Sequence, residues 1–353
     1  ACPRLLLTGF GLRYAISSIG DKQYERVFVY DTTVTLDDKL TASELADYAE
    51  ALSGVEGVAE FMPAASRSID VRGENKIVSI TLMVPQDPEQ MGSYIDLHER
   101  VSGEKLSLSD DGVIINEKLS RLLDVKEGDT ITLVNPNGRP VPVTVLGISE
   151  NYALNYVYMT PALYRQEFRE TPVYSTVLLN QEEGVSESTL SEEILAVGDG
   201  VLAVPHTSGI AGTFDAMLGS LNAIVWVIII SAGLLAFVVL YNLANINVNE
   251  RVRELATIKV LGFYDGEVTG YITRENNISA FFGIAIGLVL GIALERFVIR
   301  TAEVDAVMFA PDIAWYCFVF AGLLTALFTL IVDLVLHFQL KKIDMVESLK
   351  SVE

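Results

Sequence analysis

Three long stretches near the C-terminus of this 353-residue chain contain no charged residue. They run from 223 to 241, from 278 to 294 and from 313 to 332. Each is close to the roughly 20 apolar residues that an α-helix needs to cross a bilayer core. A helix of a soluble protein rarely stays apolar on every face for that length. The pattern therefore predicts an α-helical membrane protein with three complete spans.

The first 19 residues are also apolar, but they include Pro3, Arg4 and Arg13 and do not begin with methionine. A signal peptide would place its basic residues first and a cleavage site after the apolar core. We interpret this segment as the outer end of a first membrane helix whose beginning is missing. We therefore expect the chain to be a fragment of a longer protein.

The polar region between these apolar stretches alternates between short strand and helix patterns. Tyr24–Tyr30 has the alternation of a strand. Thr41 and Glu44 form a capping box for a helix that ends at Gly54. Further strands are expected at 58–62, 68–71, 77–84, 112–115, 129–134, 141–148, 173–179 and 201–205, with helices at 116–123 and 188–197. The two turns at 72–75 and 135–138 predict hairpins, so we expect an α+β domain with its own core.

Charge separates the polar region from the rest of the chain. The net charge is −21, and residues 21–215 hold 14 Lys and Arg against 33 Asp and Glu. An acidic surface repels nucleic acid and anionic lipid, so nucleic acid is not expected as a partner. A solvated acidic exterior is the simpler interpretation, although a cationic peptide ligand is also conceivable.

Basic residues in the short loops predict the orientation, because they mark the cytoplasmic side. They gather in the loop after the first complete span and in the C-terminal tail, at Arg251, Arg253, Lys259, Arg274, Lys341, Lys342 and Lys350. The acidic domain is therefore expected outside the cell. The predicted order is the end of a first membrane helix at 1–19, an extracellular domain at 20–213, a span at 214–244, a cytoplasmic coupling loop at 245–276, a span at 277–299, an extracellular loop at 300–312, a span at 313–338 and a cytoplasmic tail at 339–353.

Signatures of an enzyme or a metal site are absent from the sequence. The chain has no P-loop, so it is not expected to hydrolyse ATP by that route. His98, His206 and His337 do not have the spacing of metal ligands, and Cys2 and Cys317 cannot form a Cys-based zinc site. We expect no catalytic residue, no metal and no cofactor in this chain.

The cytoplasmic loop contains a charged helix pattern at Glu250–Phe263. Glu250 with Arg253, and Arg251 with Glu254, have the i,i+3 spacing of ion pairs, and Gly262 can end the helix. Such a helix could lie on lipid headgroups or bind a protein partner. Surface helices usually have a mainly basic polar face, so its glutamates favour a protein partner.

Two features within the spans could serve packing or function. Gly283, Gly287 and Gly291 recur every four residues, so another helix can approach closely, either in this chain or in another subunit. Asp333 lies in the last turns of the final span, about two helical turns before Lys341. Its place near the inner interface favours a hydrated side chain over a functional site.

Several motifs resemble one family. The segment Glu250–Phe263 (ERVRELATIKVLGF), followed by the glycine-bearing span, resembles FtsX-like ABC transporter permeases of the MacB/LolC group, also called type VII. Asp111–Leu119 (DGVIINEKL) is similar to the MacB-type extracellular core domain. The tail at 342–350 is similar to that of large duplicated permeases from Gram-positive bacteria.

The resemblance implies both an architecture and a function. It implies four spans per unit, with this chain as the second half of a duplicated permease. The expected partners are a cytoplasmic ABC ATPase dimer, the missing first half of the same polypeptide, and membrane lipid. It further implies that the ATPase grips the cytoplasmic helix, at Glu250, Arg251, Arg253, Glu254, Leu255, Lys259 and Gly262, and drives the outer domain by mechanotransmission.

The resemblance leaves the purpose of that motion open. Export or extraction of a peptide or lipid-linked molecule is one possibility. Activation of an extracellular cell-wall hydrolase by the outer domain is another. A membrane sensor with an extracellular binding domain is a third, and association with an ATPase would separate it from the first two.

Overall fold

The computed structural model describes residues 2–73, 76–135 and 137–341. The chain divides into two compact units. A helical unit contains the described residues of Ala1–Ser17, Leu218–Ala302 and Pro311–Glu353. An α+β unit contains Ser18–Met217 together with Glu303–Ala310. The predicted tail motif at 342–350 lies outside the described residues.

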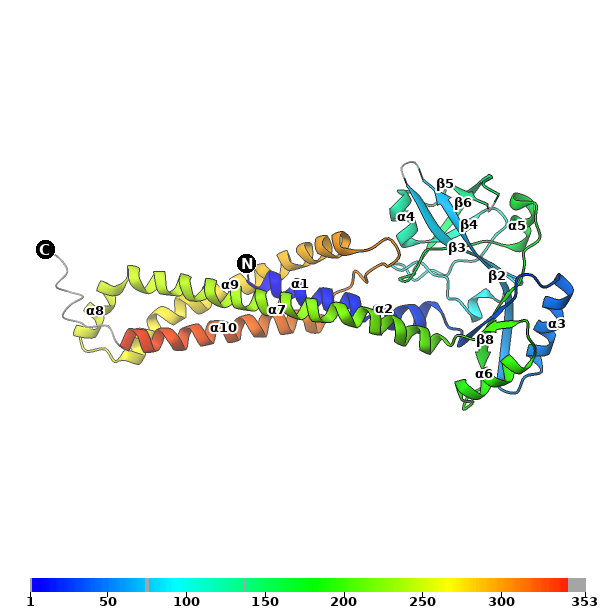
Figure 1. Cartoon of the computed structure of the whole chain (residues 1–353). Coiled ribbons are helices and arrows are strands. Elements are labelled where there is room, and N and C mark those ends of the chain that lie inside the picture. Colours follow the sequence, from blue (N-terminus) through cyan, green and yellow to red (C-terminus); the bar gives the residue numbers. More distant parts are fainter. Residues whose placement is uncertain (1, 74–75, 136, 342–353) are drawn as a thin grey trace. The chain divides into compact units, whose positions relative to one another are not determined.

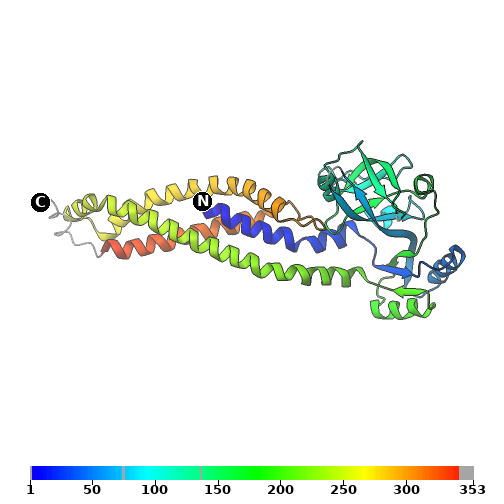
Figure 2. The same ribbon diagram turned by 45° about the horizontal axis from the view of Figure 1, so that its top comes forward.

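The helical unit is built from long apolar helices that run side by side in both ribbon views (Figures 1 and 2). Its long helices are α1 (Cys2–Ser17), α7 (Thr207–Glu250, of which the part from Leu218 belongs to this unit), α9 (Asp265–Ala302) and α10 (Trp315–Lys341), and α8 (Val252–Val260) is a short helix between α7 and α9. Within the described part of the chain, three segments are long and apolar enough to cross a membrane, namely Ala223–Glu250, Gly266–Ala302 and Trp315–Phe338. These segments confirm the three predicted spans.

The α+β unit contains a closed ring of strands. The chain first forms two short helices, α2 (Ile19–Asp21) and the π-helix η1 (Lys22–Val27). The ring consists of β2 (Val58–Arg72), β3 (Ile77–Pro85), β4 (Val113–Asn116), β5 (Thr130–Val134), β6 (Pro140–Ser149) and β7 (Tyr156–Tyr158). Strand pairing runs β3–β7–β4–β6–β5–β2, and β2 pairs again with β3. An apolar core packs among these strands, α4 (Glu117–Leu123) and α5 (Pro161–Phe168).

A second lobe extends the sheet beyond β2. There β2 pairs with β8 (Thr176–Gln181), followed by β1 (Thr32–Leu36) and β9 (Val201–Ala203). Helices α3 (Ala42–Ser53) and α6 (Glu187–Ala196) cover this part with a core of their own. The long strand β2 serves both lobes, because Val58–Ala64 pairs with β8 and Ala64–Arg72 pairs with β3. A 3-10 turn, η2 (Met91–Ser93), lies in the connection after β3.

Most predicted elements of the outer domain are present. The Thr41–Glu44 capping box forms in full at the start of α3. Arg72 pairs with Ile77 in the β2–β3 hairpin, whose tip residues 74–75 lie outside the described residues. The β5–β6 hairpin also forms, apart from Pro136, which is not described. Strand β8 begins at Thr176 rather than at Val173.

The predicted strand at Tyr24–Tyr30 is wrong. Lys22–Val27 forms a π-helix, and only Phe28 makes an isolated bridge, to Ile95. The β propensity of its aromatic and branched residues is overridden because the helical backbone buries Gln23 and Val27 completely. The first strand of the sheet is instead Thr32–Leu36, which the prediction missed together with β7 and α5.

The connection between α9 and α10 falls in the extracellular loop predicted at 300–312 and contributes residues to the α+β unit. Its residues Glu303–Ala310 belong to the α+β unit, although they follow the rest of that unit by more than 80 positions in the chain. Met308, Phe309 and Ala310 are buried there. This segment is therefore part of the outer domain.

Candidate functional site

Helix α8 is a short helix set between two sharp changes of direction. Arg251 leaves the helical conformation after α7 ends at Glu250, and α8 begins at Val252. Gly262 has a φ of +95°, a left-handed conformation that glycine adopts without steric cost. Its N–H donates to the carbonyl of Lys259, which closes the C-terminus of α8.

One face of α8 is fixed to the neighbouring helices. Leu255 and Ala256 are buried, and Leu255 packs in a cluster with Ala244, Val248, Val268, Val332 and Leu336 of α7, α9 and α10. Arg251 donates two hydrogen bonds to Glu275 of α9, at 2.6 and 3.0 Å. This bidentate pair has a geometric specificity that a single contact lacks. The sequence pattern predicted a pair between Arg251 and Glu254, whereas the bidentate partner is on α9.

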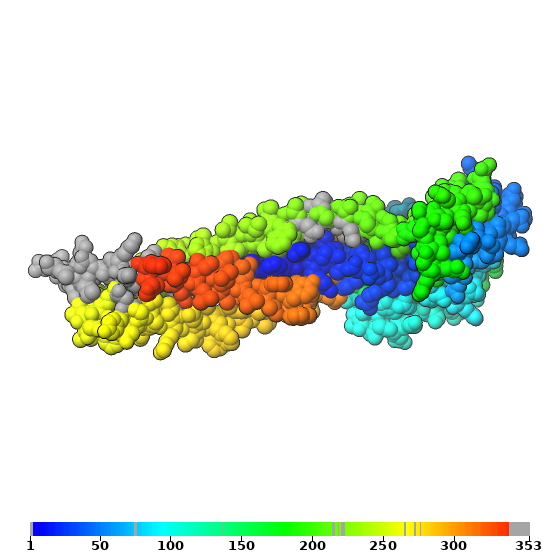
Figure 3. All heavy atoms as spheres, turned by 90° about the horizontal axis from the view of Figure 1, so that it is seen from below, coloured from blue at the N-terminus to red at the C-terminus, as the bar shows by residue number. Residues whose placement is uncertain are grey.

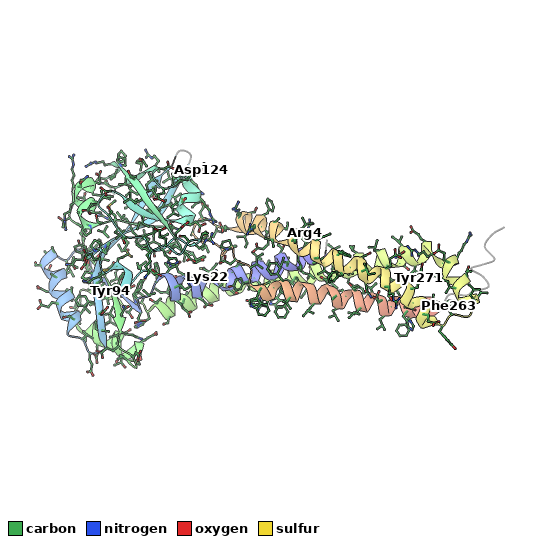
Figure 4. All side chains as sticks on the ribbon, turned by 180° about the vertical axis from the view of Figure 1, so that it is seen from behind. Arg4, Lys22, Tyr94, Asp124, Phe263 and Tyr271 are labelled. Atoms are coloured by element: carbon green, nitrogen blue, oxygen red, sulfur yellow. The ribbon has the colours of Figure 1, made fainter. Side chains whose placement is uncertain are left out.

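The opposite face of α8 and the turn after it are exposed. We call this the α8 surface; its members are Arg253, Glu254, Thr257, Val260, Leu261, Phe263 and Tyr264. Leu261 is 73% exposed and Tyr264 80% exposed. Figure 4 shows Phe263 and Tyr271 at the same end of the helices. Apolar side chains exposed beside charged ones are typical of a protein-binding surface.

The structure divides the predicted coupling residues into two groups. Glu250, Arg253 and Glu254 are exposed. Leu255 and Lys259 are buried and Arg251 is held by Glu275, so these three position the helix. The prediction omitted the exposed apolar residues Val260, Leu261, Phe263 and Tyr264. The signal in the sequence that could have added them to the prediction is a group of apolar residues at and just after the end of a charged helix.

The predicted glycine face lies partly against α1. A Cβ added at Gly287 would lie 2.9 Å from Cγ of Pro3, and one at Gly291 would lie 2.8 Å from Cδ2 of Leu7. These two glycines therefore allow α1 and α9 to approach closely. A Cβ at Gly283 would meet nothing within 4 Å.

An apolar groove of about 620 Å³ opens between α1, α7 and α10. Figure 3 shows α1 at the surface between these two helices. The groove is lined with aromatic side chains, and the guanidinium carbon of Arg13 lies 5.0 Å from the ring centre of Trp226. Trp and Tyr near the end of a span are typical of the membrane–water interface.

The three histidines have structural partners. His98 lies between the Asp96 carbonyl and Glu150, with Nε2 2.5 Å from the Glu150 carboxylate. His206 bridges Thr32 and Ser191, and His337 contacts Thr269. In the described part of the chain, no group of three His, Cys, Asp or Glu residues could hold a metal ion.

Comparisons with known proteins match both units. A family model described as the FtsX-like permease C-terminal region matches residues 226–337. A model of the MacB-like periplasmic core domain matches residues 5–197. An uncharacterized ABC transporter permease of Methanocaldococcus jannaschii is 24% identical over 262 residues, which are 70% of this chain and 65% of that protein. The match thus spans less than two thirds of the relative's length.

Solved structures include similar outer domains. The periplasmic region of MacB from Actinobacillus actinomycetemcomitans is 14% identical, with a TM-score of 0.35, over 54% of this chain and 94% of that one. The extracellular domain of the noncanonic ABC-type transporter YknZ from Gram-positive bacteria is 19% identical, with a TM-score of 0.34, over 50% and 98%.

The family matches fit the two units of the structure. The FtsX-like match covers the three apolar spans, and the MacB-like match covers most of the α+β unit. The protein is therefore a multi-pass protein of the plasma membrane with an extracellular α+β domain. The chain belongs to the FtsX-like permeases of ABC transporters that carry a MacB-like periplasmic core domain.

Proposed function

We propose that this permease transmits the ATP-driven motion of a cytoplasmic ATPase dimer to its extracellular domain. The observation that carries the proposal is the two-sided construction of α8. Its inner face is fixed by Leu255, Ala256 and the Arg251–Glu275 pair, whereas its outer face is exposed. A push on that outer face would move α7 and α9 rather than bend a flexible loop.

The source of energy is a separate chain in this proposal. The sequence contains no P-loop, so ATP would be hydrolysed by the ATPase that binds the α8 surface. The proposed assembly also includes a second permease half, because an ATPase dimer offers two equivalent binding sites. This chain would act without a catalytic residue of its own.

The extracellular domain offers a place for a substrate. A groove of about 990 Å³ is lined by α3, by residues 86–88 and 90, and by residues 171–174. Its lining includes Phe61, Pro63 and Tyr174, and its charged members are Glu50 and Asp87. A groove of this size and mixed character suits a peptide or a lipid-linked molecule. We therefore propose export or extraction of such a substrate.

Charge reversal on the α8 surface tests the coupling proposal. Glu254→Arg should reduce ATPase co-purification at least about ten-fold, because reversing a charge at an interface creates like-charge repulsion or an unpaired charge. Arg300→Glu, an exposed reversal at the other end of α9, is the matched control and should have no effect. Normal ATPase association and normal ATP-dependent activity of Glu254→Arg would show that this surface is not the coupling site.

A further inference from the structure

Four residues of the outer domain, Asn151–Leu154, connect segments that are distant in the sequence. On one side they hold Gln23 of the π-helix. The Gln23 carbonyl oxygen accepts from the backbone N–H groups of Tyr152 and Ala153, at 2.7 and 3.0 Å. Its amide donates to the Asn151 side chain at 2.9 Å. Gln23 is fully buried, so its polar atoms depend on these bonds.

On another side the same four residues pair with the segment that joins α9 to α10. The Leu154 N–H donates to the Ala306 carbonyl at 2.7 Å, and the Met308 N–H donates to the Tyr152 carbonyl at 2.8 Å. Ala153 and Val307 thus form an antiparallel bridge. We call Gln23, Asn151–Leu154 and Glu303–Ala310 the outer joint.

Ion pairs fix the first residues of the joined segment. Lys118 Nζ lies 2.9 Å from Glu303 Oε2, and the two side chains are only 8% and 4% exposed. The other Glu303 oxygen accepts from the Phe309 N–H at 3.1 Å. Asp305 pairs with Lys76 at 2.7 Å and accepts from Asn155 through its backbone carbonyl. Separating a buried pair leaves an uncompensated charge, so this segment is difficult to detach.

One of the three described non-glycine residues with a positive φ lies at the same place, the other two being Asp124 and Arg169. Leu154 has a φ of +60°, a left-handed conformation that is unfavourable for a branched side chain. Its carbonyl accepts from the amides of Asn116 and Asn151, and its N–H belongs to the bridge. Such strain persists only where surrounding contacts determine the backbone, and it is common at functional sites.

We propose that the outer joint stays closed throughout the ATP cycle and moves the extracellular domain together with α9 and α10. The joined segment begins directly after Ala302, where α9 ends, and α10 begins at Trp315. The π-helix follows α1 and α2 in the chain, so the joint also ties that attachment to the same four residues. The proposal rests on the proposed mechanotransmission and adds a second path for it, separate from α7.

A reversible disulfide across the bridge tests the proposal. The Ala153–Val307 pair is flanked by the two bridge hydrogen bonds, and such non-hydrogen-bonded pairs have Cα atoms about 4.5 Å apart, within the range of a disulfide. Ala153→Cys with Val307→Cys would be made in a Cys2→Ser, Cys317→Ala background. The oxidised permease with its ATPase should keep at least about half of the ATP-dependent change in amide hydrogen exchange of the outer domain. If oxidation reduced this exchange change more than about ten-fold and a reductant restored it, the proposal that the joint stays closed would be wrong.

A second variant tests whether the joint carries the motion. Lys118→Met with Glu303→Gln removes the pair and keeps an acceptor for Phe309, and Arg121, which lies 3.8 Å from Glu303, keeps its own pair with Glu117. The double variant should bind the ATPase normally, but the ATP-dependent change in hydrogen exchange of its outer domain should be at least about five-fold smaller. Arg67→Gln breaks an exposed pair with Glu170 and should leave that change as it is. If the double variant kept the full ATP-dependent change in hydrogen exchange, the outer joint would not carry the motion.

The joint and the proposed function can fail separately. Loss of the coupling function would appear as absence of ATPase association in the unmodified chain. The joint predicts in addition that the amides of Leu154 and Met308 exchange slowly with and without the ATPase. Rapid hydrogen exchange at both of these amides would contradict a closed outer joint, whether or not the ATPase binds.

Discussion

At the residue scale, the three glycines of α9 provide a matched comparison. Gly291→Leu would place a side chain against Leu7, so we expect it to destabilise the helical unit by about 1–3 kcal/mol. Gly283→Leu meets open space in this chain and should leave thermal stability in detergent unchanged. If Gly283→Leu keeps stability but prevents association with a second permease half, Gly283 belongs to an intersubunit contact. Equal stability of the two variants would contradict the α1–α9 packing described here.

Spacing in the sequence identifies residues that share a helix face or could form an ion pair, but it does not identify the residues that they contact. The four-residue repeat placed Gly287 and Gly291 on one helix face, yet it could not show that Pro3 and Leu7 would face them. Lys118 and Glu303 look like ordinary surface charges in the sequence and form a buried pair only because the fold brings them together. Arg251 similarly pairs with Glu275 of α9, because the turn at Gly262 returns the chain past α8.

At the element scale, the capping box of α3 makes a pH-dependent contribution to stability. Hydrogen bonds from the Thr41 backbone and hydroxyl lower the pKa of Glu44 below its ordinary value of 4.5. Because the folded value is the lower one, this contribution is present above pH 4.5 and is lost as the pH falls through the folded value.

Three substitutions test the capping box and its pH dependence. Thr41→Ala should cost about 1 kcal/mol at pH 7, measured by denaturant unfolding, and Thr41→Ser should restore most of it. The stability difference between the unmodified chain and Glu44→Gln should disappear at low pH. If this stability difference instead grew as the pH fell, the capping box would not stabilise α3 through the ionised Glu44 carboxylate.

Elements with local signals were predicted well, and those defined by distant contacts were not. The α3 cap and the β5–β6 turn depend on neighbouring residues, and both form as predicted. The π-helix at Lys22–Val27 has the composition of a strand, and its conformation depends on the partners of Gln23 more than 120 positions away. The short strand β7 is likewise defined by its pairing with β3 and β4.

At the scale of the whole molecule, the chain completes its outer domain with residues from between two membrane helices. The family resemblance indicated an extracellular core domain after the first helix, and the structure adds Glu303–Ala310 to it. This addition makes four chain crossings between the two units, at residues 17–18, 217–218, 302–303 and 310–311. A domain with four crossings has fewer independent motions than one held by two.

Replacing Glu303–Ala310 in the full chain by a Gly-Ser segment of equal length tests this organisation. The change removes the buried side chains of Met308 and Phe309 and leaves Lys118 without Glu303. Burial of two such apolar side chains contributes about 3 kcal/mol or more, so the outer domain should lose at least about 6 °C of thermal stability. The same replacement of the exposed turn at 101–104 should shift it by less than about 2 °C. Equal thermal stability of the two replaced chains would mean that Glu303–Ala310 contributes little to the stability of the outer domain. A loss seen only when Glu303–Ala310 is replaced would mean that this connection between α9 and α10 completes the extracellular domain.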